Sequence, residues 1–111
     1  MRFETVDTFW VKIYLSGPIE VAKQIIRRVC LQEGLFVTIE PTTYIYTGGE
    51  EIGYVVGLLN YPRFPTSNEA LTHRAEELAE ELMQGTYQHS VLIVNPSKSY
   101  WISRREENIA K

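Results

Sequence analysis

Two hydrophobic periodicities alternate along the chain, and their order constrains the fold more than any other feature of the sequence. Apolar residues at every second position predict a strand, whereas apolar residues at intervals of three and four predict a helix. Glycine and proline separate the segments and mark the turns. The segments follow one another in the order strand, helix, strand, strand, helix, strand.

The expected strands are rich in β-branched and aromatic residues. They run from Thr8 to Leu15, from Leu35 to Tyr46, from Ile52 to Tyr61 and from Val91 to Val94. The second and third flank Thr47-Gly48-Gly49-Glu50, whose glycines favour a turn, so these two strands are expected to form an antiparallel hairpin. Because Pro41 has no amide hydrogen to donate, the second strand is expected at an edge of the sheet.

Both helices carry an apolar stripe and recognisable ends. Pro18 suits the first turn of the first helix, and Gly34 suits the left-handed position after its end. The second helix follows Thr66-Ser67-Asn68-Glu69, which matches the capping box, and it ends at Gly85. The two stripes consist of Ile19, Ala22, Ile25, Ile26, Val29 and Cys30, and of Leu71, Ala75, Leu78, Ala79 and Leu82.

This order predicts a ferredoxin-like two-layer α+β sandwich, with two helices packed on one face of an antiparallel sheet. Tyr100-Trp101-Ile102 predicts a possible short fifth strand. A chain of 111 residues buries enough surface for one core. We therefore expect a single domain over residues 1–111, with residues 1–7 and 104–111 frayed.

Composition excludes several classes of protein. The chain is 44% hydrophobic and 23% charged, which disfavours disorder, and its apolar runs are too short to cross a bilayer. A formal net charge of −3 gives no electrostatic footprint for DNA or RNA. Its one cysteine, Cys30, cannot form an internal disulfide. We expect a cytoplasmic protein that binds no membrane, no DNA and no cofactor.

The face of the sheet away from the helices is expected to be apolar. Alternation places Trp10 and Tyr14 there, and it leaves Tyr54, Val56 and Leu58 there if the glycines of the third strand face the helices. Large apolar patches mark interfaces. The chain's own ends, a second copy, or a ligand or nucleic acid could cover this face. The interpretation favoured here is a homodimer that pairs through the sheet.

A second surface is predicted near the prolines that follow the third strand. Rigid prolines, exposed aromatic rings and a directional positive charge are typical of small recognition surfaces. The candidate recognition residues are Tyr44, Tyr46, Glu50, Glu51, Arg63 and Phe64. They would contact a protein or a small-molecule partner.

Two strands resemble the motifs of RNA-recognition domains. Residues 13–18 are similar to the shorter ribonucleoprotein motif, and residues 53–57 are similar to the longer one. The longer motif needs a basic residue before its glycine and a second aromatic residue to stack bases. Here Ile52 and Val56 occupy those positions. The resemblance implies single-stranded RNA binding through Tyr14 and Tyr54.

Two segments resemble nucleoside deoxyribosyltransferases. Residues 12–19 are similar to the opening strand and turn of that family, and residues 49–54 are similar to the segment that carries its nucleophilic glutamate. The resemblance implies a nucleophile at Glu51, but that family has a parallel, flavodoxin-like sheet, whereas an antiparallel sheet is expected here. The chain departs from the family in its length and in placing this glutamate beside a hairpin turn.

No metal site or nucleophile is predicted elsewhere. His73 and Glu77 lie one helical turn apart but have no third ligand, and Cys30 lies on an apolar stripe. The leading hypothesis is a small soluble, non-enzymatic binding or regulatory accessory protein that homodimerises through its open sheet face. The alternative is a small enzyme or nucleotide-binding protein that uses Glu50 or Glu51 with Tyr14 and Arg63.

Overall fold

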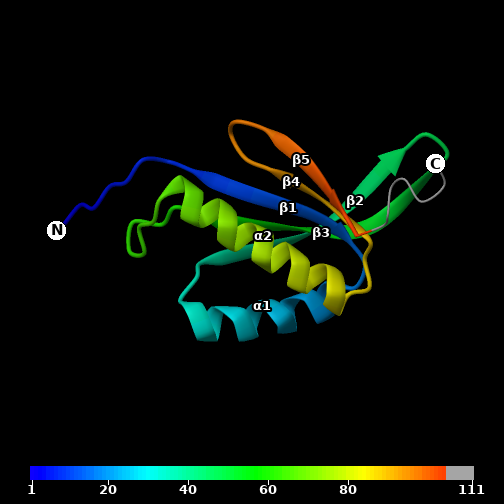
Figure 1. Cartoon of the computed structure of the whole chain (residues 1–111), viewed down its shortest axis with the longest axis horizontal. Helices are drawn as coiled ribbons and strands as arrows, with labels where there is room; N and C mark the ends of the chain where they lie inside the picture. Colours follow the sequence, from blue (N-terminus) through cyan, green and yellow to red (C-terminus); the bar gives the residue numbers. More distant parts are fainter. Residues whose placement is uncertain (105–111) are drawn as a thin grey trace.

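The computed structural model describes residues 1–104 of the chain. These residues form a five-stranded antiparallel sheet with two helices on one face (Figure 1). The sheet order is β2-β3-β1-β4-β5, so β1 is the central strand. This confirms the ferredoxin-like α+β sandwich. The elements are β1 (Trp10–Ser16), α1 (Ile19–Glu33), β2 (Val37–Tyr46), β3 (Gly49–Leu59), α2 (Asn68–Gly85), β4 (Ser90–Val94) and β5 (Ser99–Ser103).

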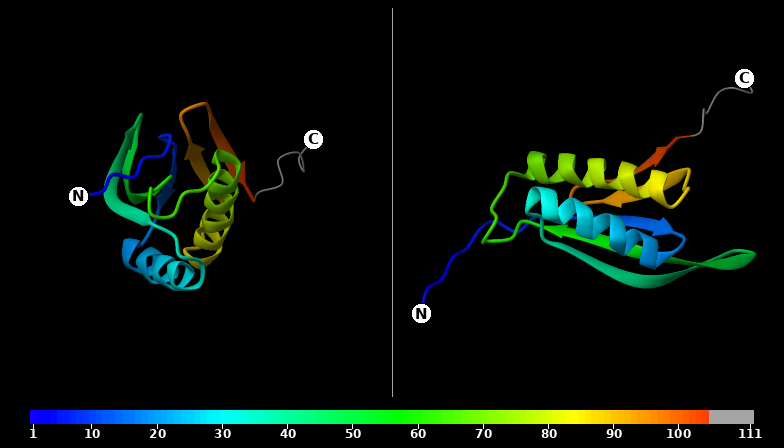
Figure 2. Two further views of the ribbon diagram at one scale, coloured as in Figure 1. Left: turned by 90° about the vertical axis from the view of Figure 1, so that its left-hand side faces the viewer. Right: turned by 90° about the horizontal axis from the view of Figure 1, so that it is seen from below.

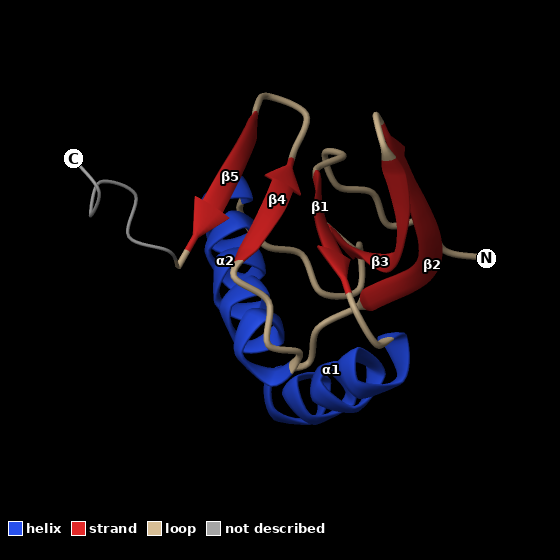
Figure 3. Cartoon of the chain, turned by 90° about the vertical axis from the view of Figure 1, so that its right-hand side faces the viewer, coloured by secondary structure: helices blue, strands red, loops and turns tan. Residues whose placement is uncertain are grey.

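The two layers leave one face of the sheet free of helices. Figure 2 shows α1 and α2 side by side on the same side of the strands. Seen end-on, the β2–β3 and β4–β5 hairpins stand on either side of β1 and rise away from the helices (Figure 3). The face opposite the helices is therefore concave, with β1 at its bottom (Figure 3). It is called the open face below.

The strand register places the β3 side chains on the face opposite to the one predicted. Val11, Ile13 and Leu15 of β1 are buried beneath the helices, and they pair with Leu58, Val56 and Tyr54 respectively. Directly opposed residues in an antiparallel pair share a face. The side chains of Tyr54, Val56 and Leu58 accordingly lie in the core, with exposures of 0%, 0% and 1%.

The prediction that these three residues form an interface on the open face is wrong. The alternation of β3 was assigned to the wrong faces, by a shift of one residue. The glycines Gly53 and Gly57 face away from the helices, opposite Ser16 and Lys12. Because side chains of a strand alternate between two faces, a shift by one residue moves every side chain of β3 to the opposite face. Trp10 and Tyr14 do lie on the open face, as predicted, since they alternate with the buried residues of β1.

The ends of the helices and strands agree with the sequence-based predictions to within a few residues. Gly34 adopts the left-handed conformation (φ 66°) at the end of α1, as predicted. The N-cap of α2 is Ser67, whose hydroxyl accepts a hydrogen bond from the backbone N–H of Ala70 at 3.0 Å. The capping box starting at Thr66 is therefore displaced by one residue. The third strand begins at Gly49 rather than Ile52, because the turn after Tyr46 is short.

The chain's described ends do not cover the open face. The fifth strand exists, but it pairs with β4 along the edge of the sheet instead of folding back over it. Residues 1–9 form no strand or helix and extend beyond the sheet (Figure 1). The fraying expected for residues 105–111 lies outside the described residues. No helix in the described part is long and apolar enough to span a bilayer.

Candidate functional site

A groove of about 400 Å³ lies on the open face, near the end of β1 that leads into α1. Residues of all five strands or of their immediate neighbours surround it. Because β1 is central, its side chains form the middle of the groove, and the two hairpins supply the sides. The lining residues are Tyr14, Leu15, Ser16, Tyr44, Glu51, Ser90, Val91, Leu92 and Trp101.

Tyr44 crosses the open face from the edge strand β2 towards β1. Its hydroxyl points between two backbone carbonyl oxygens, at 2.8 Å from that of Leu15 and 3.1 Å from that of Tyr54. The ring occupies the space over Gly53, where an added Cβ would lie 2.5 Å from Tyr44 Cε2 and 2.3 Å from the Leu15 oxygen. Glycine at position 53 is thus required for Tyr44 to reach β1.

The surroundings of Tyr44 keep its phenol neutral. The pKa of Tyr44 is raised to about 12, mainly by burial and then by the nearby Tyr14, Tyr54 and Glu51. A neutral phenol can donate its hydrogen to the carbonyl oxygens at neutral pH. Tyr44 therefore acts as a fixed wall of the groove.

Glu51, Tyr14 and Trp101 give the groove its chemistry. Glu51 lies on β3 opposite Tyr44, and its side chain is exposed. Tyr14 pairs with Leu92, and Leu92 pairs with Trp101, so the tyrosine and the tryptophan lie at one level of the sheet on the same face. Trp101 is 58% exposed. Aromatic faces with one carboxylate suit a ligand that is flat and positively charged.

The structure brings together part of the predicted recognition surface. Tyr14, Tyr44 and Glu51 line one groove. Tyr46 lies further along the open side of β2, opposite Gly49. Glu50 is the neighbour of Glu51 on a strand, and its side chain therefore points to the other face.

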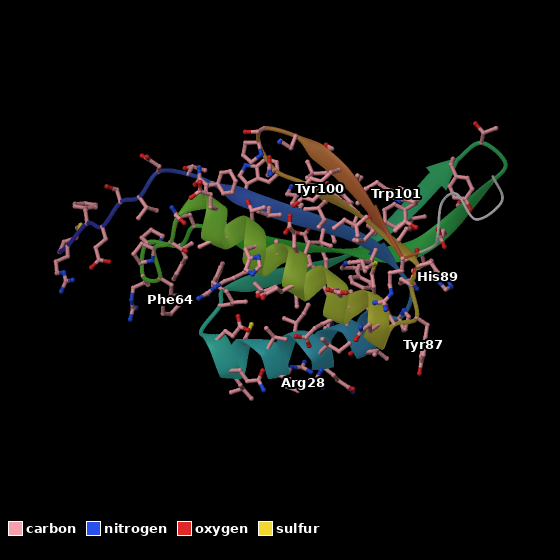
Figure 4. All side chains as sticks on the ribbon, in the orientation of Figure 1. Arg28, Phe64, Tyr87, His89, Tyr100 and Trp101 are labelled. Carbon is pink, nitrogen blue, oxygen red and sulfur yellow. The ribbon has the colours of Figure 1, made fainter. Side chains whose placement is uncertain are left out.

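Arg63 and Phe64 do not belong to this site. Arg63 lines a separate shallow cleft with Arg2, Glu4, Tyr61 and Pro62. Figure 4 shows Phe64 at the end of the molecule remote from Trp101. Phe64 packs near Tyr61, which stacks on Phe36 at 4.5 Å between ring centroids. The prediction of one recognition surface is wrong because the long β2–β3 hairpin separates its two halves.

The sequence interpretation did not assign Ser90, Leu92 and Trp101 to a site. The signal was present, since Trp101 alternates with Tyr100 and Ile102 in the short fifth strand. The face of the sheet on which the Trp101 side chain lies depends on the pairing of β5 with β4. That pairing joins Trp101 to Leu92, and it cannot be read from either segment alone.

A second cavity on the open face lies towards the opposite end of β1. Its volume is about 410 Å³, and its residues are Trp10, Val11, Lys12, Phe36, Thr38, Gly57, Leu58 and Leu59. Lys12 Nζ lies 5.4 Å from the centroid of the Trp10 ring. The two cavities therefore share β1, on which Lys12 and Tyr14 are successive open-face residues.

A further cleft of about 630 Å³ separates α2 from the β4–β5 hairpin. There Tyr100 donates a hydrogen bond to Glu76 Oε2 at 2.8 Å. Burial first, and then this carboxylate, raise the pKa of Tyr100 to about 12. His73 pairs with Glu77 at 3.2 Å on the exposed side of α2. No group of three metal-ligating side chains occurs among residues 1–104.

Comparison with known proteins identifies relatives by fold only. No protein-family model matches the chain, and no curated protein sequence matches it significantly. A phage SAM lyase in the apo state superposes with a TM-score of 0.65 and 19% identity, covering 89% of this chain and 91% of that chain. A phage SAM lyase in complex with S-methyl-5'-thioadenosine superposes with a TM-score of 0.63 and 17% identity, covering 93% and 95%. The shared property is the fold.

This finding contradicts the hypothesis of a non-enzymatic binding or regulatory protein, because both of these superposed chains are SAM lyases, which are enzymes. It favours the enzyme alternative. RNA binding through Tyr14 and Tyr54 is also wrong, since Tyr54 is fully buried and cannot stack on a base. Every strand pair is antiparallel, as predicted, and the sheet therefore departs from the parallel sheet of the deoxyribosyltransferases.

Proposed function

We propose that the protein is an enzyme that cleaves S-adenosylmethionine (SAM) and releases S-methyl-5'-thioadenosine in the open-face groove. The observation that carries the proposal is the meeting of Glu51, Tyr14 and Trp101 in one groove. The fold shared with the phage SAM lyases supports it. A cytoplasmic location belongs to the same proposal, and the thiol of Cys30 is compatible with a reducing compartment.

The groove matches the chemistry of this substrate. SAM combines a flat adenine with a sulfonium cation and an ammonium group. The rings of Tyr14 and Trp101 offer faces on which adenine stacks or a cation rests. The Glu51 carboxylate attracts the positive groups, and no lysine or arginine in the described residues lines this groove to oppose it.

The reaction needs no second substrate. When the bond between the sulfonium sulfur and the methionine carbon chain breaks, its electron pair stays on sulfur, which becomes a neutral thioether. The carbon that loses sulfur then forms a new bond within the four-carbon fragment. Either the fragment's own carboxylate oxygen bonds to it, or it forms a double bond to the neighbouring carbon, which loses a proton. Because the sulfonium charge disappears, the apolar aromatic rings beside it favour this step.

The experiment is to incubate the purified protein with SAM and to measure S-methyl-5'-thioadenosine by chromatography and mass spectrometry. A heat-denatured sample corrects for spontaneous decay of SAM. We expect the native protein to form product in proportion to its concentration. Product formation no faster than in the denatured sample would refute the proposed function.

Glu50 provides a matched control for Glu51. Both changes, Glu51→Gln and Glu50→Gln, remove one charge from neighbouring exposed positions of β3. We expect Glu51→Gln to lower kcat/KM by at least about tenfold, because a charge-assisted contact to the cation is lost. Glu50→Gln leaves it within about twofold, because exposed charges outside the groove contribute little. Equal effects would remove Glu51 from the site.

A further inference from the structure

Lys12 is the one basic residue within the five strands. It lies in the middle of the central strand and points to the open face, between Gly57 of β3 and Val94 of β4. Its side chain is exposed. In the described part of the chain it forms no ion pair with a carboxylate, and its ammonium lies over the Trp10 ring. A lone cation in the centre of a sheet face is available to a ligand.

The surface around Lys12 is hollow because its neighbour on β3 has no side chain. Gly57 lies opposite Lys12, and the cavity of about 410 Å³ opens above it. A Cβ at Gly57 would come within 2.7 Å of Thr38 Oγ1. The Thr38 hydroxyl therefore borders the space over Gly57, and the cavity beside it has room for a small anionic group near Lys12.

Lys12 and Glu51 lie at opposite ends of one stretch of the open face. Gly57, the partner of Lys12, lies six residues from Glu51 along β3, which corresponds to about 20 Å at 3.3 Å per residue. Tyr14 lies between them on the same face. The Lys12 ammonium lies over Trp10, on the side away from Glu51, so the exposed lysine side chain has to turn towards Tyr14 to meet the substrate. With the lysine turned in this way, a sulfonium and a carboxylate separated by three carbons lie between the two charged side chains.

We propose that Lys12 binds the α-carboxylate of SAM and thereby selects substrates that retain this group. The inference rests on the proposed function and extends the site from the groove at Tyr14 into the cavity over Gly57. The ammonium and the carboxylate form a charge-assisted hydrogen bond. Glu51 attracts the positive part of the substrate at the other end, so the two charges fix its direction along β1.

The test compares ligands with and without the carboxylate by calorimetric binding. SAM carries the group, whereas decarboxylated SAM and S-methyl-5'-thioadenosine lack it. In Lys12→Met, which keeps most of the apolar stem, we expect Kd for SAM to rise by about tenfold or more. Kd for the other two ligands stays within about twofold. Lys12→Arg restores part of the affinity for SAM, because it restores the positive charge.

Lys23→Met is the matched control, since Lys23 lies on α1, away from the open face, and pairs with the exposed Glu20. It should leave all three affinities unchanged. Unchanged SAM binding in Lys12→Met, or equal weakening of all three ligands, overturns the role of Lys12 while the lyase proposal stands. Failure of the wild-type protein to bind SAM overturns both. Retained binding of S-methyl-5'-thioadenosine shows that the Lys12→Met variant is folded.

Discussion

Two tyrosines ten residues apart illustrate how differently one residue type is used on the two faces of the sheet. The Tyr44 hydroxyl on the open face donates to backbone carbonyls. The Tyr54 hydroxyl is buried in the core, near Thr86 but without a hydrogen bond. Thr86 uses its own hydrogen for the Leu82 carbonyl oxygen at 2.6 Å. Burial raises the pKa of Tyr54, whose hydroxyl therefore stays neutral.

The substitution Tyr54→Phe removes this unpaired hydroxyl and keeps the ring. An unsatisfied buried group costs free energy that its removal recovers, so we expect the free energy of unfolding to stay equal or to increase by up to about 1 kcal/mol. Tyr44→Phe, by contrast, loses a hydrogen bond and costs about 0.5–1.5 kcal/mol. Urea unfolding of both variants measures the difference, and a clear destabilisation by Tyr54→Phe would reveal a partner for its hydroxyl.

Stability should fall at alkaline pH. The pKa values of Tyr44 and Tyr100 are raised to about 12 in the folded protein, from 10.0. Their neutral forms therefore contribute stability that is complete below pH 10 and is lost as the pH rises to about 12. We expect Tm to decline across this window, and the decline to be smaller in Tyr44→Phe. An identical decline in the variant would show that Tyr44 does not contribute.

At the scale of elements, the glycines of β3 explain why the face of this strand was mispredicted. Glycine gives no hydrophobic signal, and the residues between the glycines are apolar on both sides. The pattern of β1 is unambiguous because Lys12 marks its polar face. In β3 the deciding contact is Tyr44 over Gly53, which joins residues of two strands. The alternation of side chains within one strand does not predict a contact between two strands.

Gly53→Ala tests this arrangement. The added Cβ would meet the Leu15 carbonyl oxygen and the Tyr44 ring at distances that no real Cβ tolerates, so the backbones of β1 and β3 must shift. We expect a loss of about 1–3 kcal/mol or more in unfolding free energy. At Gly57 only the Thr38 hydroxyl obstructs a Cβ, and it can rotate away. Gly57→Ala is therefore the milder control, and equal losses would contradict the role of Tyr44.

The helices and their order were predictable because their signals are local. Apolar stripes, Gly34 and the Ser67 region identify both helices, and the order of segments identifies the sandwich. Within the site, Tyr14 and Glu51 were recognisable from the residues themselves. Trp101 and Lys12 were not, since their neighbours come from β4 and β3 through long-range pairing. Long-range register is what local periodicity cannot supply.

At the scale of the whole molecule, homodimerisation through the sheet stays a prediction. The variants that test it must change the open face, because Tyr54 and Val56 lie in the core. We expect sedimentation to give twice the chain mass, and Leu59→Glu, at an exposed position near Trp10, to give the monomer. A wild-type monomer at high micromolar concentration would refute this prediction, and it would leave the groove and the Lys12 cavity on this face uncovered.

The two tryptophans of the chain divide the open face between them. Trp10 lines the cavity beside Lys12, and Trp101 lines the groove with Tyr14 and Glu51. The protein therefore carries an intrinsic fluorophore at each end of the surface on which the proposed substrate would lie. Single Trp→Phe variants would leave one emitter each, so that the quenching of either signal reports which half of the surface a ligand occupies.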